Sequence, residues 1–153
     1  MNILLENLNP WAILVASLTS FIIGAVWFGP KTFYPVWIRA LGREVPTERI
    51  EMTKGETALM FGGTYLAGLI QVSTLALIIS LARAAAPGFG AGTGAVFGLV
   101  FSLGLGAFAS LSHRMFGQPD HKVYRSLKVW IIEVGQDVLA LTVAGAILGA
   151  WVL

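Results

Sequence analysis

The chain has 153 residues, of which 56% are hydrophobic and 12% are charged, and its formal net charge is +2. Soluble domains carry about 25% charged residues, so this composition indicates a membrane protein, and the small positive charge gives no reason to expect a nucleic-acid partner. The absence of cysteine excludes a disulfide, a thiolate metal site and a cysteine nucleophile. The length is that of a single domain, residues 1–153.

Four apolar segments follow one another along the chain, at about 11–28, 57–82, 91–112 and 127–151. Each has about 18 or more residues, the length that a hydrocarbon core of ~30 Å requires. We therefore predict an all-α fold, an integral membrane bundle of four transmembrane helices forming one transmembrane domain. The first segment is expected to be retained, because the residues before it contain no Lys or Arg, unlike a cleaved signal peptide.

A short helix of a different kind is predicted after the first segment, where Pro30 ends the apolar run. Phe33, Trp37 and Leu41 recur every four residues, and Lys31 lies near the start of this pattern. Such a pattern is typical of an amphipathic helix that lies in the membrane interface.

Small residues form two helix-packing seams. In lipid, close approach of backbones through small residues is a main source of helix association. The first seam follows every fourth position of the third segment, and the second lies in the fourth segment. The members are Gly90, Gly94, Gly98, Ser102, Gly106 and Ser110, and then Gly145 and Gly149. Two seams exceed what one small bundle needs, which favours association with further helices.

The basic residues predict the orientation. Nine of the ten Lys and Arg residues lie in or beside two loops, 29–56 and 113–126. Since cytoplasmic loops are enriched in these residues, both loops are predicted to be cytoplasmic and both chain termini outside. The expected interfacial anchors are Trp11, Trp27, Trp37, Trp130 and Trp151, and the cations expected to meet lipid headgroups are Arg114, Lys122, Arg125 and Lys128.

The fourth segment carries the most unusual residues, Glu133 and Asp137, one helical turn apart, with Gln136 beside them. Counted from Leu127 at ~1.5 Å per residue, the two acids lie about 9 and 15 Å deep. An acid at the bilayer centre costs roughly 2.5–3.5 kcal/mol, so both should face protein or water.

Two interpretations of these acids within one chain stay open, and a third is that they meet a charged group on another subunit. In the first, Glu133 passes a proton or cation to Asp137, with Gln71 of the second segment as the partner of Asp137. In the second, the group is a hydrogen-bonded cluster that fixes helix register, with Glu133 drawn toward Lys128 or Arg125.

A motif at the end of the first segment resembles the signature of a bacterial family known only as a domain of unknown function. The motif is Gly24-x-x-Trp27-Phe28-x-Pro30-x-x-Phe33-x-x-x-Trp37, followed by Gly42, and the last helix resembles the family's through Glu133 and Gly149-Ala150-Trp151. Position 28 is Phe where Tyr is the more frequent residue. The resemblance implies a small four-helix protein of the bacterial inner membrane, and it implies no activity.

The expected function is non-enzymatic. No nucleotide-binding loop, nucleophile elbow or metalloprotease motif occurs, so we expect no catalytic residue, cofactor or metal. The favoured interpretation is a small membrane protein that acts through helix packing, as a homo-oligomer or an accessory subunit of a larger complex, in contact with the lipid bilayer. The alternative is a transporter or channel-like protein that moves protons or a small solute past Glu133 and Asp137.

Overall fold

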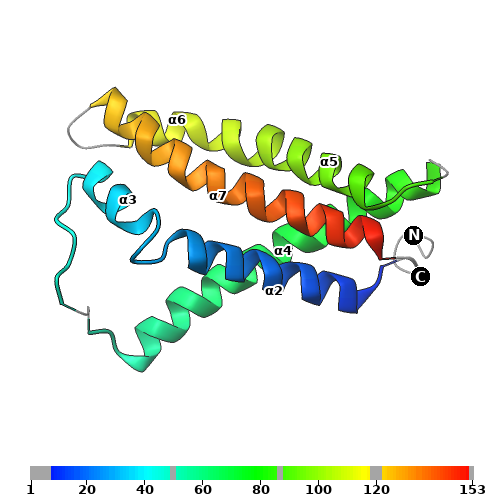
Figure 1. Ribbon diagram of the computed structural model, residues 1–153, viewed down its shortest axis with the longest axis horizontal. Coiled ribbons are helices and arrows are strands. Elements are labelled where there is room, and N and C mark those ends of the chain that lie inside the picture. Colours follow the sequence, from blue (N-terminus) through cyan, green and yellow to red (C-terminus); the bar gives the residue numbers. More distant parts are fainter. Residues whose placement is uncertain (1–7, 49–50, 86–87, 118–121, 152–153) are drawn as a thin grey trace.

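The computed structural model describes residues 8–48, 51–85, 88–117 and 122–151 (Figure 1). Across these ranges the chain forms helices and no strand. Four helical stretches are long and apolar enough to cross a membrane. They are α2 (Pro10–Trp27), α4 (Lys54–Ala85), a composite of α5 (Ala91–Phe101), η1 (Ser102–Ala107) and α6 (Phe108–Phe116), and α7 (Val123–Ala150). The prediction of an all-α protein with four membrane-spanning helices is confirmed.

The helices extend beyond the predicted apolar segments mainly at the ends where charged residues lie. α4 begins at Lys54 and α7 at Val123, whereas apolar runs alone suggested residues 57 and 127. A capping box accounts for the start of α4: Glu56 Oε2 accepts from the backbone N–H of Thr53, and Thr53 Oγ1 accepts from that of Glu56. Charged residues are compatible with a helix outside the hydrocarbon core, so hydropathy underestimates helix length.

The short helix expected after the first span is α3 (Tyr34–Ala40). It packs against the first half of α7 (Figure 1). Gly42 ends this segment with a φ of 77°, a backbone conformation that glycine adopts without strain.

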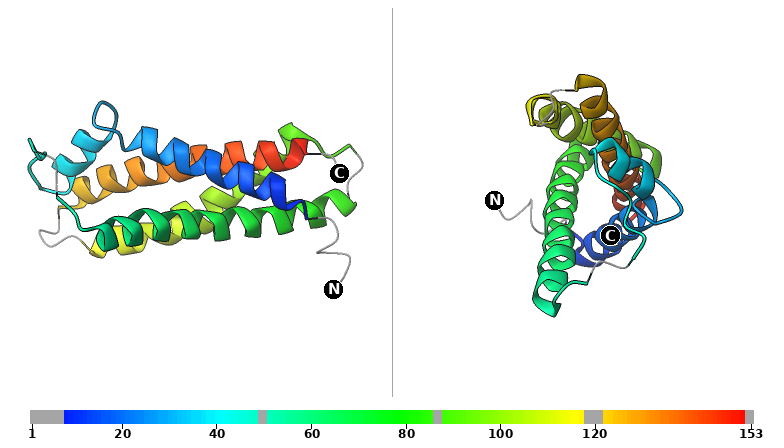
Figure 2. Two further views of the ribbon diagram at one scale, coloured as in Figure 1. Left: turned by 90° about the horizontal axis from the view of Figure 1, so that it is seen from below. Right: turned by 90° about the vertical axis from the view of Figure 1, so that its left-hand side faces the viewer.

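α7 lies at the centre of the bundle, with α2 and the α5–η1–α6 helix on different sides of it (Figure 2). The core lies where α2, α4 and α7 meet, toward the ends that carry Pro10, Ala85 and Ala150. Its fully buried members include Ala16, Val72, Leu75 and Ala144, and small side chains on α2 and α7 let the helices approach closely.

The two predicted seams pack against each other. A Cβ added to Gly94 would fall on the carbonyl oxygen of Gly145, and one added to Gly98 on that of Leu141. A Cβ on Gly149 would fall on the Gly90 carbonyl. Since these contacts lie within one chain, α5 and α7 use up the small-residue surfaces that we had regarded as available to further helices.

The α5–α7 seam ends at the π-helical turn η1, residues 102–107. Ser102 is still fully buried, but a Cβ on Gly106 would meet no atom within 4 Å, so Gly106 lies outside the seam in which we predicted it. A π-turn has more residues per turn than an α-helix, so it shifts the four-residue stripe off the facing helix. Ser110 follows it, half-buried, and its hydroxyl donates to the carbonyl of Ala107 at 2.8 Å.

Candidate functional site

Glu133 on α7 is the centre of a polar and aromatic cluster. Arg114 on α6 holds both carboxylate oxygens: its Nε lies 2.6 Å from Oε2 and its Nη2 2.7 Å from Oε1. Trp37 on α3 donates its indole N–H to Oε1 at 3.0 Å. The Glu133 side chain is 21% exposed and that of Arg114 41% exposed. We call Trp27, Trp37, Arg114 and Glu133 the Glu133 cluster.

The direction of helical side chains explains why Arg114 reaches Glu133. Side chains tilt toward the N-terminus of their own helix. α6 and α7 are antiparallel neighbours (Figure 1), so Arg114 tilts away from the loop that joins them while Glu133 tilts toward it. The two groups therefore meet although they are 19 residues apart. We had predicted Arg114 among the headgroup-contacting cations and had considered Lys128 or Arg125 as partners of Glu133.

The motif that closes the first span supplies the aromatic side of the cluster. Trp27 donates to the carbonyl of Ile132 at 3.0 Å, and its ring approaches Gly135 closely enough that a Cβ there would lie 3.0 Å away. Trp27 also stacks on Phe33 at a centroid distance of 4.3 Å. Phe28 meets the edge of Trp37, with the centroids 5.3 Å apart. The motif residues thus shape a surface on which residues 132–136 of α7 rest.

The tryptophans predicted as interfacial anchors fall into two groups. Three of them donate their indole N–H inside the protein: Trp27 and Trp37 as described, and Trp130 to the carbonyl of Ala107 in the π-turn at 2.9 Å. Trp11 is 68% exposed and Trp151 36% exposed, and both lie at the opposite end of the bundle. Sequence reasoning placed these side chains near the interfaces but did not identify the carbonyls that the first three bind.

Asp137 differs sharply from Glu133. It is half-buried, and it makes no hydrogen bond or ion pair with the residues that the structure describes. The register that pairs Gly94 with Gly145 and Gly98 with Leu141 brings Asp137 to the level of Ser102, where the π-turn begins. Its neighbour Gln136 points elsewhere, since its Nε2 would lie 3.4 Å from a Cβ on Gly24 of α2.

Gln71 does not join this group. It is exposed on α4, near the middle of the helix, and forms no hydrogen bond with any described residue. The structure therefore does not bring Gln71 to Asp137 as we had expected. Lys122, Arg125 and Lys128 are exposed along the start of α7. No group of three or more metal-ligating side chains occurs in the described ranges.

A residue that the sequence analysis did not single out, Arg83, closes the other end of α7. Its Nη1 donates to the carbonyl of Trp151 at 2.9 Å, and its Nη2 to those of Gly149 and Leu148 at 2.7 and 3.2 Å. Its guanidinium also lies 5.6 Å from the ring centroid of Phe89. A cation at this place stabilises the negative end of the helix dipole. The sequence feature that could have identified Arg83 is its position as the single charged residue in the link between the second and third apolar segments.

A family model described as "Protein of unknown function (DUF1761)" matches residues 11–149. This range includes the Glu133 cluster and most of each of the four long helices. The resemblance inferred from the sequence, to an uncharacterised family of small four-helix membrane proteins, is confirmed. Comparisons with curated proteins and with solved structures each found no match.

Proposed function

The chain belongs to the DUF1761 family, and we propose that it is a non-enzymatic membrane subunit that binds a further transmembrane helix through α4. The further helix belongs either to a second copy of this chain or to another protein. One observation carries the proposal: the first half of α4 lies outside the packed core. All residues from 54 to 67 are exposed except Thr57 and Tyr65, which are half-buried.

The exposed side of α4 has the composition of a helix-packing surface. Leu59, Gly63, Leu66 and Ile70 recur at steps of four, three and four, the spacing of a two-helix seam, and all four are exposed. A Cβ on Gly63 would meet nothing within 4 Å. Glycine on a lipid-facing surface contributes little contact with lipid, whereas it lets a second helix approach closely.

Gln71 supports the same conclusion. Its amide lies near the middle of a membrane-spanning helix and is exposed without a partner in the described part of the chain. A polar side chain in the hydrocarbon core is unfavourable unless it finds a hydrogen-bond partner, and amides in this position bind across helix interfaces. A helix docked on Gly63 and Ile70 would bring such a partner within reach.

The Glu133 cluster supports a structural role over an acid–base one. Arg114 binds both carboxylate oxygens of Glu133, and Trp37 donates a further hydrogen bond to Oε1. A carboxylate held in this way joins α3 and α6 to α7, so its oxygens are engaged in contacts between helices.

The proposal is tested by native mass spectrometry of the protein extracted from its own membrane in a mild detergent. We expect a defined complex that Gly63→Leu abolishes, because the larger side chain blocks close approach at α4. The matched control is Gly92→Leu, at another glycine with nothing within 4 Å, on α5. A parent protein that is monomeric, or a complex that survives Gly63→Leu, contradicts the proposal. The masses distinguish a homo-oligomer from a heteromeric assembly.

Asp137 favours a second candidate, a protein that moves protons or a small cation. It is half-buried in a membrane-spanning helix and lacks a partner among the described residues, as expected of a group that binds and releases a proton. In liposomes, Asp137→Asn should abolish a pH-driven flux that Glu51→Gln, at an exposed loop carboxylate, leaves unchanged. Absence of flux in the parent protein excludes this candidate.

A further inference from the structure

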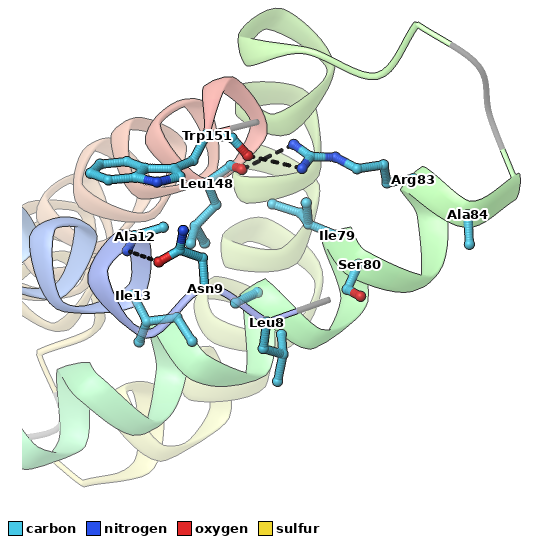
Figure 3. A pocket seen from close by; sticks show the side chains of 11 residues that line it. Leu8, Asn9, Ala12, Ile13, Ile79, Ser80, Arg83, Ala84, Leu148 and Trp151 are labelled. Atoms are coloured by element: carbon cyan, nitrogen blue, oxygen red, sulfur yellow. Dashed lines mark hydrogen bonds between the residues drawn. The ribbon is translucent and has the colours of Figure 1, made fainter. Parts of the chain in front are cut away.

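A cavity of about 290 Å³ lies at the end of the bundle opposite the Glu133 cluster. It is enclosed by the first turn of α2, the last turns of α4 and the end of α7 (Figure 3). Neither the family assignment nor the proposed function assigns a role to this cavity. Its volume is close to the lower limit of small-molecule sites, roughly 300 Å³.

The cavity changes from polar to apolar along α4. Arg83, Ser80, Ile79 and Ala76 lie on one face of this helix and line the cavity in that order. At ~1.5 Å per residue, Ala76 lies roughly 10 Å further along the helix than Arg83. Because α4 spans the membrane, the polar residues lie toward the membrane surface and the apolar ones toward its middle. The cavity is thus polar toward the membrane surface and apolar toward the middle of the membrane, in the same order as the headgroup and acyl chains of a lipid.

Hydrogen-bond donors remain at the polar end. Arginine has five N–H donors, and three bonds to α7 carbonyls leave two for a ligand. Asn9 caps α2 through its Oδ1, which accepts from the backbone N–H groups of Trp11 and Ala12 at 2.9 and 3.2 Å. Its amide Nδ2 makes no bond with a described residue, and the Ser80 hydroxyl lines the same space.

The apolar end is formed by three helices. Ala12 and Ile13 of α2 face Ile79 of α4 and Leu148 of α7 across the cavity (Figure 3). Ala12 and Ile79 are buried, so this wall belongs to the packed core. A small inorganic anion would contact the donors but leave the apolar wall empty, whereas the alkyl chain of a lipid packs against that wall.

From these features we propose that the cavity binds one phospholipid with an anionic headgroup. Its phosphate accepts from Arg83 and Asn9, and the first part of an acyl chain lies against Ala76, Ile79 and Leu148. Among the described residues that line the cavity, Arg83 is the charged one, so an anionic headgroup is favoured over one that brings a cationic group beside the guanidinium.

The test is native mass spectrometry of the delipidated protein in detergent, with dioleoylphosphatidylglycerol or dioleoylphosphatidylcholine added at equal concentration. We expect one phosphatidylglycerol to be retained per chain and phosphatidylcholine to bind about tenfold less, because the two lipids share the phosphate but the cationic choline group would lie beside the Arg83 guanidinium. A third sample receives oleate, an anion with an alkyl chain but no phosphate. Equal retention of both phospholipids, retention of neither, or preferential retention of oleate would overturn the proposal.

Two exposed alanines at the end of α4 give a matched pair of variants. Ala84 lines the cavity and Ala85 does not. Ala84→Trp is expected to fill the cavity and to reduce phosphatidylglycerol binding by about tenfold or more, while Ala85→Trp binds as the parent does. Arg83→Gln should remove the headgroup preference, but it also releases the end of α7. The alanine pair therefore decides the result, and equal binding by both alanine variants contradicts the proposal.

Discussion

Arg114 and Glu133 form a two-bonded ion pair between α6 and α7, with Nε–Oε2 and Nη2–Oε1 distances of 2.6 and 2.7 Å. The pair lies beyond the π-turn, where the glycine seam between the two helices has ended. It thus joins the helices at the level where close backbone packing no longer does. With the Trp37 bond it also fixes α3 to the bundle.

We expect Arg114→Gln to destabilise the protein by about 1–3 kcal/mol, because it leaves a half-buried carboxylate without its charged donor. The measurement is equilibrium unfolding in mixed detergent micelles. Glu133→Gln should cost a similar amount. The double variant should lose clearly less than the sum of the two, because an amide–amide pair leaves no uncompensated charge. Additive losses would show that the two side chains do not interact.

Trp37→Phe is expected to release α3 from α7 while leaving the four long helices in place. The substitution keeps an aromatic ring against Phe28 and removes the donor to Glu133, which should cost about 1.5–3 kcal/mol as a hydrogen bond to a charged group. Hydrogen exchange of residues 34–40 measures the effect. Tyr34→Phe is the control, and equal exchange in both variants would contradict a docking role for the indole N–H.

The apolar runs were sufficient to predict the four helices, because length and hydropathy alone decide whether a helix can cross a bilayer. The partner of Glu133 was not predictable in this way. Hydropathy says nothing about which helices are neighbours, and the choice among Arg114, Arg125 and Lys128 depends on side-chain direction across an antiparallel pair. Gln71 failed as a partner of Asp137 for the same reason: equal depth does not place two residues on facing surfaces.

The packing seam was predicted by residue type but not by partner. Gly94 and Gly145 both appeared in four-residue repeats, and nothing in either repeat specified that each would face the other within one chain. The π-turn was also invisible, because residues 102–107 continue the same small-residue pattern as the α-helix before them. Gly106 was therefore assigned to a seam that the helix has already left.

Gly94→Ala should disturb folding of the single chain. Its Cβ would fall on the carbonyl oxygen of Gly145, a backbone atom that cannot move aside, and overpacking of this kind costs typically 1–3 kcal/mol. Gly92→Ala is the matched control on the same helix, since a Cβ there meets nothing within 4 Å. Unfolding in mixed micelles should show a loss for Gly94→Ala only. Equal stability of the two variants would contradict the close contact between α5 and α7.

The orientation in the membrane stays a prediction, and the lack of cysteine makes it simple to test. Single cysteines are introduced at Glu44, in the loop after α3, and at Ala85, at the end of α4, both of which are exposed. The excess of Lys and Arg in loops 29–56 and 113–126 predicts that Glu44 faces the cytoplasm and Ala85 faces outward. A membrane-impermeant maleimide applied to intact spheroplasts should therefore label Ala85→Cys and should label Glu44→Cys only after lysis. The reverse pattern would place both termini inside, and the cavity beside Arg83 would then open toward the cytoplasmic leaflet.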